Sequence, residues 1–295
     1  MPGVSWHGDP PPAAPEIRER LQAHVRHLAE TIGPRNLSFY PALEATVEYL
    51  QGQLEGCGYR VNRLSFEAEG ALFHNLEAGT GPGPYVVVGA HYDSVLDCPG
   101  ANDNASGVAA VLELARLLAG VEGLRFVLFP NEEPPFYRTE EMGSVRYVRQ
   151  LAPFEVRFMV CLETVGYYVS EPDSQRAPFP GVPDVGDFVA FVGNSMSAPL
   201  VQRLVGRWRE RVAFPSLGVA ATDFSESFLL EAGMGMSDHA SFWAAGIPAV
   251  MVTDTVFYRY DHYHELSDTW EKLTYEPFAR MVEGLALTLR GELEG

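Results

Sequence analysis

The chain has 295 residues, of which 46% are hydrophobic, and its formal net charge at neutral pH is −18. An acidic surface of this kind argues against nucleic acids and anionic membranes as partners, because phosphate groups are bound by basic surface. No apolar run approaches the roughly 18 to 20 residues that cross a bilayer, no secretory signal is visible, and the three cysteines are scattered, so we expect a cytoplasmic protein.

The N-terminal half alternates between helical and strand patterns. Residues 1–14, rich in proline, are expected to form a flexible arm. Apolar residues at helical spacing predict helices over residues 15–32, 40–57 and 105–120. Strands are expected over residues 59–66, 72–78, 84–92 and 124–130. The last two strands are almost continuously apolar, which is typical of strands covered on both faces.

The same alternation continues in the C-terminal half, interrupted by a long proline-rich loop at 170–187. The strands expected here cover residues 156–166, 187–193 and 247–254. The expected helices cover residues 142–151, 197–212, 237–246 and 275–293. Regular alternation of apolar strands with helices predicts an α/β fold in which helices sandwich one sheet, and we expect residues 15–295 to form a single domain.

Residues able to bind a metal follow four of the expected strands. In chain order they are His91, Glu132, Glu133, Glu163, Asp254, His262 and His264. Between the first two strand ends, the turn at 99–107 places Asp103 and Asn104 just ahead of a helix. Because sites in open α/β sheets form at the carboxyl ends of the strands, these side chains are expected to meet.

Each of these residues has an ordinary structural explanation when it is taken alone. Asp103 would be the N-cap of the following helix, and a histidine at a strand end is usually a hydrogen-bonding residue. Together, imidazoles and carboxylates that converge on one crevice are the ligand set of a divalent metal. Zinc accepts this set and leaves a coordination position open for water.

Five motifs carry a resemblance to the zinc aminopeptidase family, which also contains glutamate carboxypeptidase and, more remotely, glutaminyl cyclase. They read GAHYDSV…PGANDNASGVAAVLELARLL, NEEPPFYRTEEMGS, LETVGYY, SDHASFWAAGIPAVMVTDT and YHELSDTWEKL, and they fall within residues 35–290. The resemblance implies a three-layer α/β/α sandwich with a mixed, mostly parallel central sheet, similar to the zinc-dependent exopeptidases.

The resemblance also implies two divalent ions, expected to be Zn²⁺. His91 and Glu163 would bind one ion, Glu133 and His264 would bind the other, and Asp103 would bridge them. Many aminopeptidases of the family carry Asp where this chain has Glu163, so its longer side chain is a departure that bears on the His91 ion.

Catalytic roles are implied in the same way. Glu132 would be the general base for a metal-activated bridging water, Asp93 would fix the tautomer of His91, and Tyr263 would polarise the scissile carbonyl. Two further residues are expected to support the site structurally: Asp238 and His239. The implied activity is that of an aminopeptidase, which hydrolyses the first peptide bond of peptides with a free N-terminus.

With these roles, the adjacent residues Glu132 and Glu133 must serve the same site in different ways, one as the general base and the other as a metal ligand. Neighbouring side chains of a strand point to opposite faces, so the chain is expected to break its pleat at Asn131, with Pro134 and Pro135 holding the break.

Two other functions stay open at this point. One is a glutaminyl-cyclase-like acyltransferase with a single zinc, which would cyclise N-terminal glutamine and release ammonia. The other is a catalytically inactive binding module on a peptidase fold. The product released, a free amino acid or ammonia, would distinguish the first alternative from an aminopeptidase.

Overall fold

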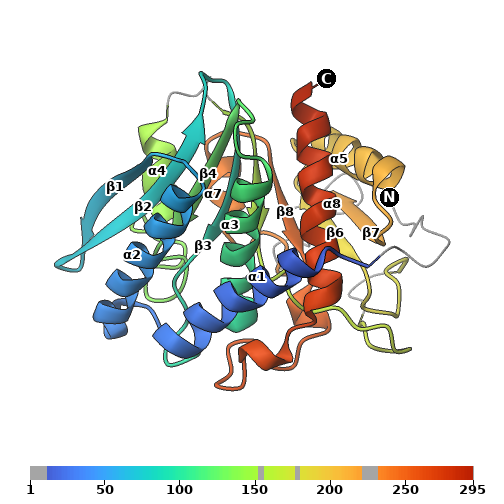
Figure 1. Ribbon diagram of the computed structural model, residues 1–295, viewed down its shortest axis with the longest axis horizontal. Coiled ribbons are helices and arrows are strands. Elements are labelled where there is room, and N and C mark those ends of the chain that lie inside the picture. Colours follow the sequence, from blue (N-terminus) through green and yellow to red (C-terminus); the bar gives the residue numbers. More distant parts are fainter. Residues whose placement is uncertain (1–11, 152–155, 177–179, 221–231, 295) are drawn as a thin grey trace.

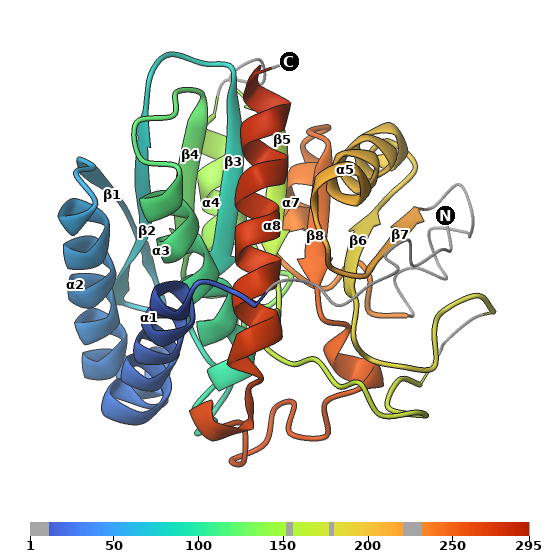
Figure 2. The same ribbon diagram turned by 45° about the vertical axis from the view of Figure 1, so that its right-hand side comes forward.

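The computed structural model describes residues 12–151, 156–176, 180–220 and 232–294. Within them an eight-stranded sheet lies between two layers of helices (Figures 1 and 2). The strands are β1 (Val61–Ala68), β2 (Ala71–Thr80), β3 (Tyr85–His91), β4 (Leu124–Phe129), β5 (Val156–Leu162), β6 (Val189–Gly193), β7 (Ser216–Ala220) and β8 (Ala249–Thr253). The α-helices are α1 (Pro15–Arg26), α2 (Tyr40–Gly56), α3 (Gly107–Leu117), α4 (Gly143–Gln150), α5 (Ala198–Arg211), α7 (His239–Ala244) and α8 (Tyr275–Glu294).

The order of strands across the sheet is β1-β2-β4-β3-β5-β8-β6-β7. The central strands β4, β3, β5 and β8 run parallel, as do β6 and β7. The antiparallel pairs are β1 with β2, β2 with β4, and β6 with β8. The expected mixed, mostly parallel sheet is therefore confirmed. The edge strand β7 is an addition, since the sequence analysis assigned no element to its five residues.

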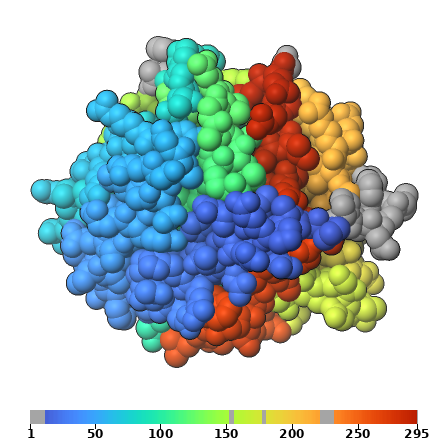
Figure 3. Space-filling view, in the orientation of Figure 1, coloured from blue at the N-terminus to red at the C-terminus, as the bar shows by residue number. Residues whose placement is uncertain are grey.

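The central strands are almost entirely apolar beyond Arg125 and Arg157 near their starts, because helices cover both of their faces. Val86 and Val88 of β3 pack into the larger core beneath α1, α2, α3, α5 and α8. Val87 points the other way, into a smaller core that includes Phe242 of α7. Figure 3 shows the face that covers the larger core, where α1 and α2, in blue, and α8, in red, pack around α3.

The start of the described chain is tied to the last helix. Residues 1–11 of the expected arm lie outside the described part. Ala13 is buried, and the amides of Ala13 and Ala14 donate to Glu276 and Glu283 of α8, at 2.8 and 3.0 Å. Among the helices in the described ranges, none combines the length and apolar character that a membrane crossing requires.

Parallel pairing also positions the polar strand ends. β4, β3, β5 and β8 are neighbours that run in the same direction, so their carboxyl ends lie along one edge of the sheet. His91 is the last residue of β3 and pairs with Phe129, the last residue of β4. The residues that follow these strands therefore start from adjacent points.

Candidate metal centre

The turn after β4 separates the two adjacent glutamates. Asn131 has a φ of 63°, in the left-handed region, so the extended conformation ends there as the sequence predicts. The Asp93 carboxylate then accepts hydrogen bonds from the amides of Glu132 and Glu133, at 3.1 and 3.0 Å. The same carboxylate lies 3.4 Å from Nδ1 of His91, an ion-pair contact rather than a hydrogen bond, so Asp93 links the imidazole to the glutamate turn.

Asp103 lies in the turn before α3, and its peptide bond to Asn104 is cis. One carboxylate oxygen is 3.3 Å from Nε2 of His91 and the other is 3.0 Å from Nε2 of His264. Asn104, rather than Asp103, accepts the amide of Gly107 at the start of the helix, at 3.1 Å. The Asp103 carboxylate is thereby left to face two histidines.

The five expected ligands form two groups that share one residue. The first group contains His91, Asp103 and Glu163, and the second contains Asp103, Glu133 and His264. Within each group, one ligand atom from every residue lies within 4.8 Å of the others. Glu163 is 3.4 Å from His91, and Glu133 is 3.4 Å from His264, so the longer Glu163 side chain does reach its histidine.

Glu132 belongs to neither group, although it is buried beside both. Burial raises the pKa of Glu132 well above its usual value, and the charges of Glu133 and Glu163 raise it further. Burial likewise raises the pKa of Glu133 to about 7, with a contribution from the charge of Asp103. The raised pKa values of both glutamates thus reflect burial and the crowding of carboxylates, which a bound cation would relieve.

This arrangement fits two divalent cations. Oxygen and imidazole nitrogen are the ligands that zinc takes in catalytic sites. Oε1 of Glu133 is buried and has no hydrogen-bond partner within the described ranges, which suits an atom reserved for an ion. The side chain of His264 is 35% exposed, so the site is open on that side.

Tyr263 and the Asp238–His239 pair lie around this centre. The Tyr263 ring stacks on His264, with centroids 3.8 Å apart, and meets Phe257 edge-on at 4.8 Å. Asp238 is fully buried, and burial raises its pKa to about 7. Nε2 of His239 lies 3.0 Å from the carbonyl oxygen of Met234.

Two supporting residues were not assigned a role from the sequence. Ser237 donates its hydroxyl to Oε2 of Glu163 at 2.6 Å, which braces the longer carboxylate. Asp268 accepts the amides of Asn102 and Asp103, at 2.9 and 3.2 Å, and so holds the turn that carries the shared ligand. Their only sequence signal was a Ser-Asp pair in each of the last two motifs.

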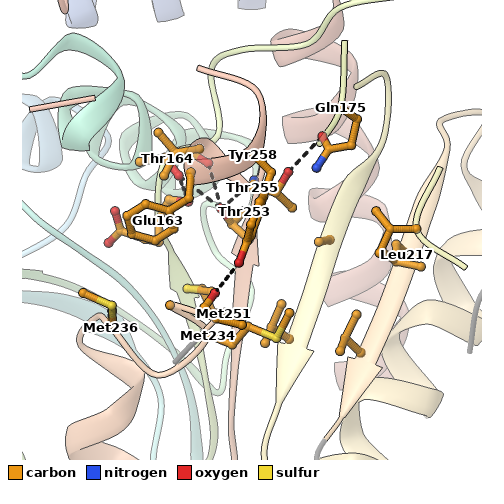
Figure 4. A pocket seen from close by; sticks show the side chains of 18 of the residues that line it. Glu163, Thr164, Gln175, Leu217, Met234, Met236, Met251, Thr253, Thr255 and Tyr258 are labelled. Atoms are coloured by element: carbon orange, nitrogen blue, oxygen red, sulfur yellow. Dashed lines mark hydrogen bonds between the residues drawn. The ribbon is translucent and has the colours of Figure 1, made fainter. Parts of the chain in front are cut away.

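An apolar pocket adjoins the first ligand group (Figure 4). It encloses about 630 Å³, counting open solvent at its mouth, and Glu163, Thr164 and Tyr263 are among the residues that line it. Further lining comes from Val192, Leu217, Val219, Met234, Met236 and Met251. In Figure 4, Glu163 and Leu217 lie at opposite sides of the pocket.

Sequence comparison places this site in a known family. The profile of peptidase family M28 matches residues 72–289. Uncharacterized protein YfbL of Escherichia coli (strain K12) is 37% identical, over 98% of this chain and 90% of that protein. Leupeptin-inactivating enzyme 1 of Streptomyces exfoliatus is 29% identical over 80% of this chain, which spans only 49% of the length of that enzyme.

Solved structures agree on the fold. BSAP, a zinc aminopeptidase from Bacillus subtilis, superposes with a TM-score of 0.71 at 15% identity, covering 93% of this chain and 95% of its own. Bacteroides thetaiotaomicron glutaminyl cyclase gives a TM-score of 0.69 at 18% identity, over 95% and 98% of the two chains. The expected fold, similar to the zinc-dependent exopeptidases, is thus confirmed. The profile match over most of the sequence shows that the chain belongs to peptidase family M28.

Proposed function

We propose that this M28 peptidase is an aminopeptidase with two zinc ions, which removes an apolar residue from peptides with a free N-terminus. The observation that carries this proposal is the pair of ligand groups sharing Asp103, with Glu132 beside them and in neither group. A buried carboxylate that is free of metal but adjacent to it is the group that a hydrolase needs as a general base.

The ligand residues set the charge of the site. Two divalent ions bring four positive charges, and Asp103, Glu133 and Glu163 return three negative charges. Ions held there would acidify a water molecule and polarise the scissile carbonyl. His91 and His264 complete the two groups through Nε2, and Asp93 fixes His91 from the Nδ1 side.

Glu132 carries the proton in this proposal. Its carboxylate accepts a proton from the attacking water and then delivers it to the leaving amine. The hydrogen bond from its backbone amide to Asp93 fixes the turn from which the Glu132 side chain extends. Tyr263, whose ring stacks on His264, would donate its hydroxyl to the scissile carbonyl.

The first residue of the substrate would lie on the Glu163 side. Carboxylates there favour an α-ammonium group, in agreement with the acidic character of the chain. The first side chain would enter the apolar pocket, whose lining includes three methionines able to adapt to different shapes.

The same pocket weighs against a cyclase. A glutamine side chain that is to be cyclised needs polar partners for its carboxamide, whereas most of the side chains lining this pocket are apolar. The second ligand group likewise favours two ions over one, and a full set of ligand side chains argues against an inactive binding module.

The test is hydrolysis of leucine p-nitroanilide by the zinc-loaded protein, with N-acetyl-leucine p-nitroanilide as the matched control. We expect release of p-nitroaniline from the free amine and a rate at least about 100-fold lower from the blocked substrate, since acetylation removes the charge that the carboxylates attract. Equal rates on both substrates would contradict an aminopeptidase. Release of ammonia from a peptide with N-terminal glutamine, without hydrolysis, would establish the cyclase instead.

A further inference from the structure

A second cavity adjoins the second ligand group through Glu133. It encloses about 680 Å³, counting open solvent, and Glu133 and Asp93 contribute to its lining. Apolar side chains on its walls are Leu37, Leu96, Pro134, Pro135 and Phe136. We call this cavity the proline groove. The function proposed above gives no role to the proline groove, which shares no lining residue with the apolar pocket.

Leu96 is held on the rim of the proline groove in an unfavourable state. Its side chain is 71% exposed to water, and its φ of 43° lies in the left-handed region, which residues other than glycine rarely adopt. The amide group of Asn36 donates to the carbonyl oxygens of Leu96 and Ser94, at 2.6 and 2.8 Å, and so fixes this conformation. Because Leu96 also lines a cavity beside two residues of the candidate metal centre, its exposed side chain is available to contact a substrate.

The opposite wall is rigid. Pro134 and Pro135 are exposed on the groove side of the loop, and proline rings fix their φ angles. Phe136 is buried and packs edge-on against Phe73 of β2, with ring centroids 5.4 Å apart. The groove is therefore formed before any ligand arrives, which lowers the entropy cost of binding.

The two cavities are attached to different ligand groups. Glu163, of the group with His91, lines the apolar pocket, and Glu133, of the group with His264, lines the proline groove. If the first residue lies in the apolar pocket and the scissile bond at the shared Asp103, the rest of the peptide continues toward Glu133. The proline groove shares Glu133 with the second ligand group, on the side where the leaving portion of the substrate would lie.

We propose that the proline groove binds the second and third residues of the peptide substrate and selects an apolar side chain there. This proposal rests on the proposed aminopeptidase function. It extends the substrate class to peptides with apolar residues on both sides of the cleaved bond. An apolar side chain of the substrate would be shielded from water by Leu96, Pro135 and Phe136.

The experiment compares three substrates on the zinc-loaded protein: leucinamide, Leu-Ser-Ala amide and Leu-Phe-Ala amide, with release of leucine followed chromatographically. We expect kcat/KM to be about tenfold higher for Leu-Phe-Ala amide than for Leu-Ser-Ala amide. Leu96→Ser should remove most of this preference, chiefly through KM, and leave leucinamide within about twofold. The matched control is Leu287→Ser on α8, which is also an exposed leucine and should change nothing.

Other outcomes overturn the proposal. One is a wild-type protein that cleaves both tripeptide amides equally, and another is a Leu96→Ser variant that slows all three substrates alike. Cleavage of none of them means that the proposed function fails. The groove is then tested by calorimetry of the zinc-loaded protein with Leu-Phe-Ala amide, where a Kd about tenfold weaker in Leu96→Ser supports it and an unchanged Kd refutes it.

Discussion

Two buried sites that contain carboxylates are built in opposite ways in this molecule. Glu113 of α3 is fully buried and receives Nε of Arg20 at 2.7 Å and Nε of Arg116 at 2.9 Å, with His24 at 3.5 Å. The candidate metal centre brings together the carboxylates of Asp103, Glu132, Glu133 and Glu163, with only two imidazoles, those of His91 and His264, among them.

The comparison separates a structural carboxylate from a functional one. Glu292 of α8 is built like Glu113, since Arg203 and Arg207 donate to its two oxygens. Buried charges are normally paired, because an unpaired one costs several kcal/mol. Where the chain supplies its own cations, nothing further is needed. At the candidate metal centre, bound cations would supply the missing positive charge.

The largest expected effect on activity comes from replacing Glu132, the carboxylate that has no arginine partner and belongs to neither ligand group. Glu132→Gln keeps the size of the side chain but cannot accept a proton, so kcat should fall by about 10² to 10⁴-fold while zinc stays bound. Elemental analysis and turnover of leucine p-nitroanilide on the same sample check both parts. Wild-type turnover by this variant would remove Glu132 from the mechanism.

Metal removal should lower the stability of the folded protein without changing the contribution of Glu113 and its partners. With free zinc at about 1,000 times its Kd, binding adds about 4 kcal/mol to the free energy of unfolding. A chelator should therefore lower Tm clearly. Glu113→Gln provides the control, because its Tm should fall by the same amount on chelation. An unchanged wild-type Tm would mean that no ion is held in the folded state.

The Glu113 cluster should show a pH dependence of its own. Burial alone would raise the pKa of Glu113, but its hydrogen bonds with His24, Arg20 and Arg116 outweigh burial and hold that pKa below its usual value of 4.5. Glu113→Gln should lower the free energy of unfolding by about 2 kcal/mol at pH 7.

The sign follows from the lowered pKa. The stability that Glu113 contributes is complete above pH 4.5 and is lost as the pH falls through the lower pKa of the folded state. The difference between wild type and Glu113→Gln, measured by urea unfolding, should therefore shrink below pH 4.5. A constant difference down to pH 3.5 would show that ionisation of Glu113 does not matter.

The smallest effect, on metal affinity, is expected from replacing Ser237, which donates a hydrogen bond to Glu163. Ser237→Ala removes the hydroxyl that donates to Glu163, so affinity for one of the two ions should weaken about tenfold while the other is retained. Competition with a chromophoric chelator measures both affinities. An equal loss at both sites would indicate a general disturbance of the fold.

That these side chains meet could be predicted from local pattern and one topological rule, whereas their individual roles as ligands came only from the family resemblance. Continuous apolar runs identify His91, Glu133 and Glu163 as strand ends, and parallel neighbours bring such ends together. The break at Asn131 was also predictable, since two adjacent glutamates cannot serve one site from a regular strand.

The remaining features depend on contacts between residues far apart in the sequence. Ser237 reaches Glu163 from the segment before α7, and Asp268 reaches the Asp103 turn from the loop before α8. The strained conformation of Leu96 is fixed by Asn36, which lies 60 residues earlier. No local pattern marks such pairs, because each depends on the folded arrangement of the whole sheet edge.

The central claim is that the metal centre holds two ions around Asp103. It is tested most directly by zinc stoichiometry per chain, measured by elemental analysis after reconstitution with excess zinc and desalting. Two ions are predicted for the wild type and one for His264→Ala, which loses a ligand of only one group. A wild-type protein that retains one ion or none, or a variant that still retains two, would contradict the shared site.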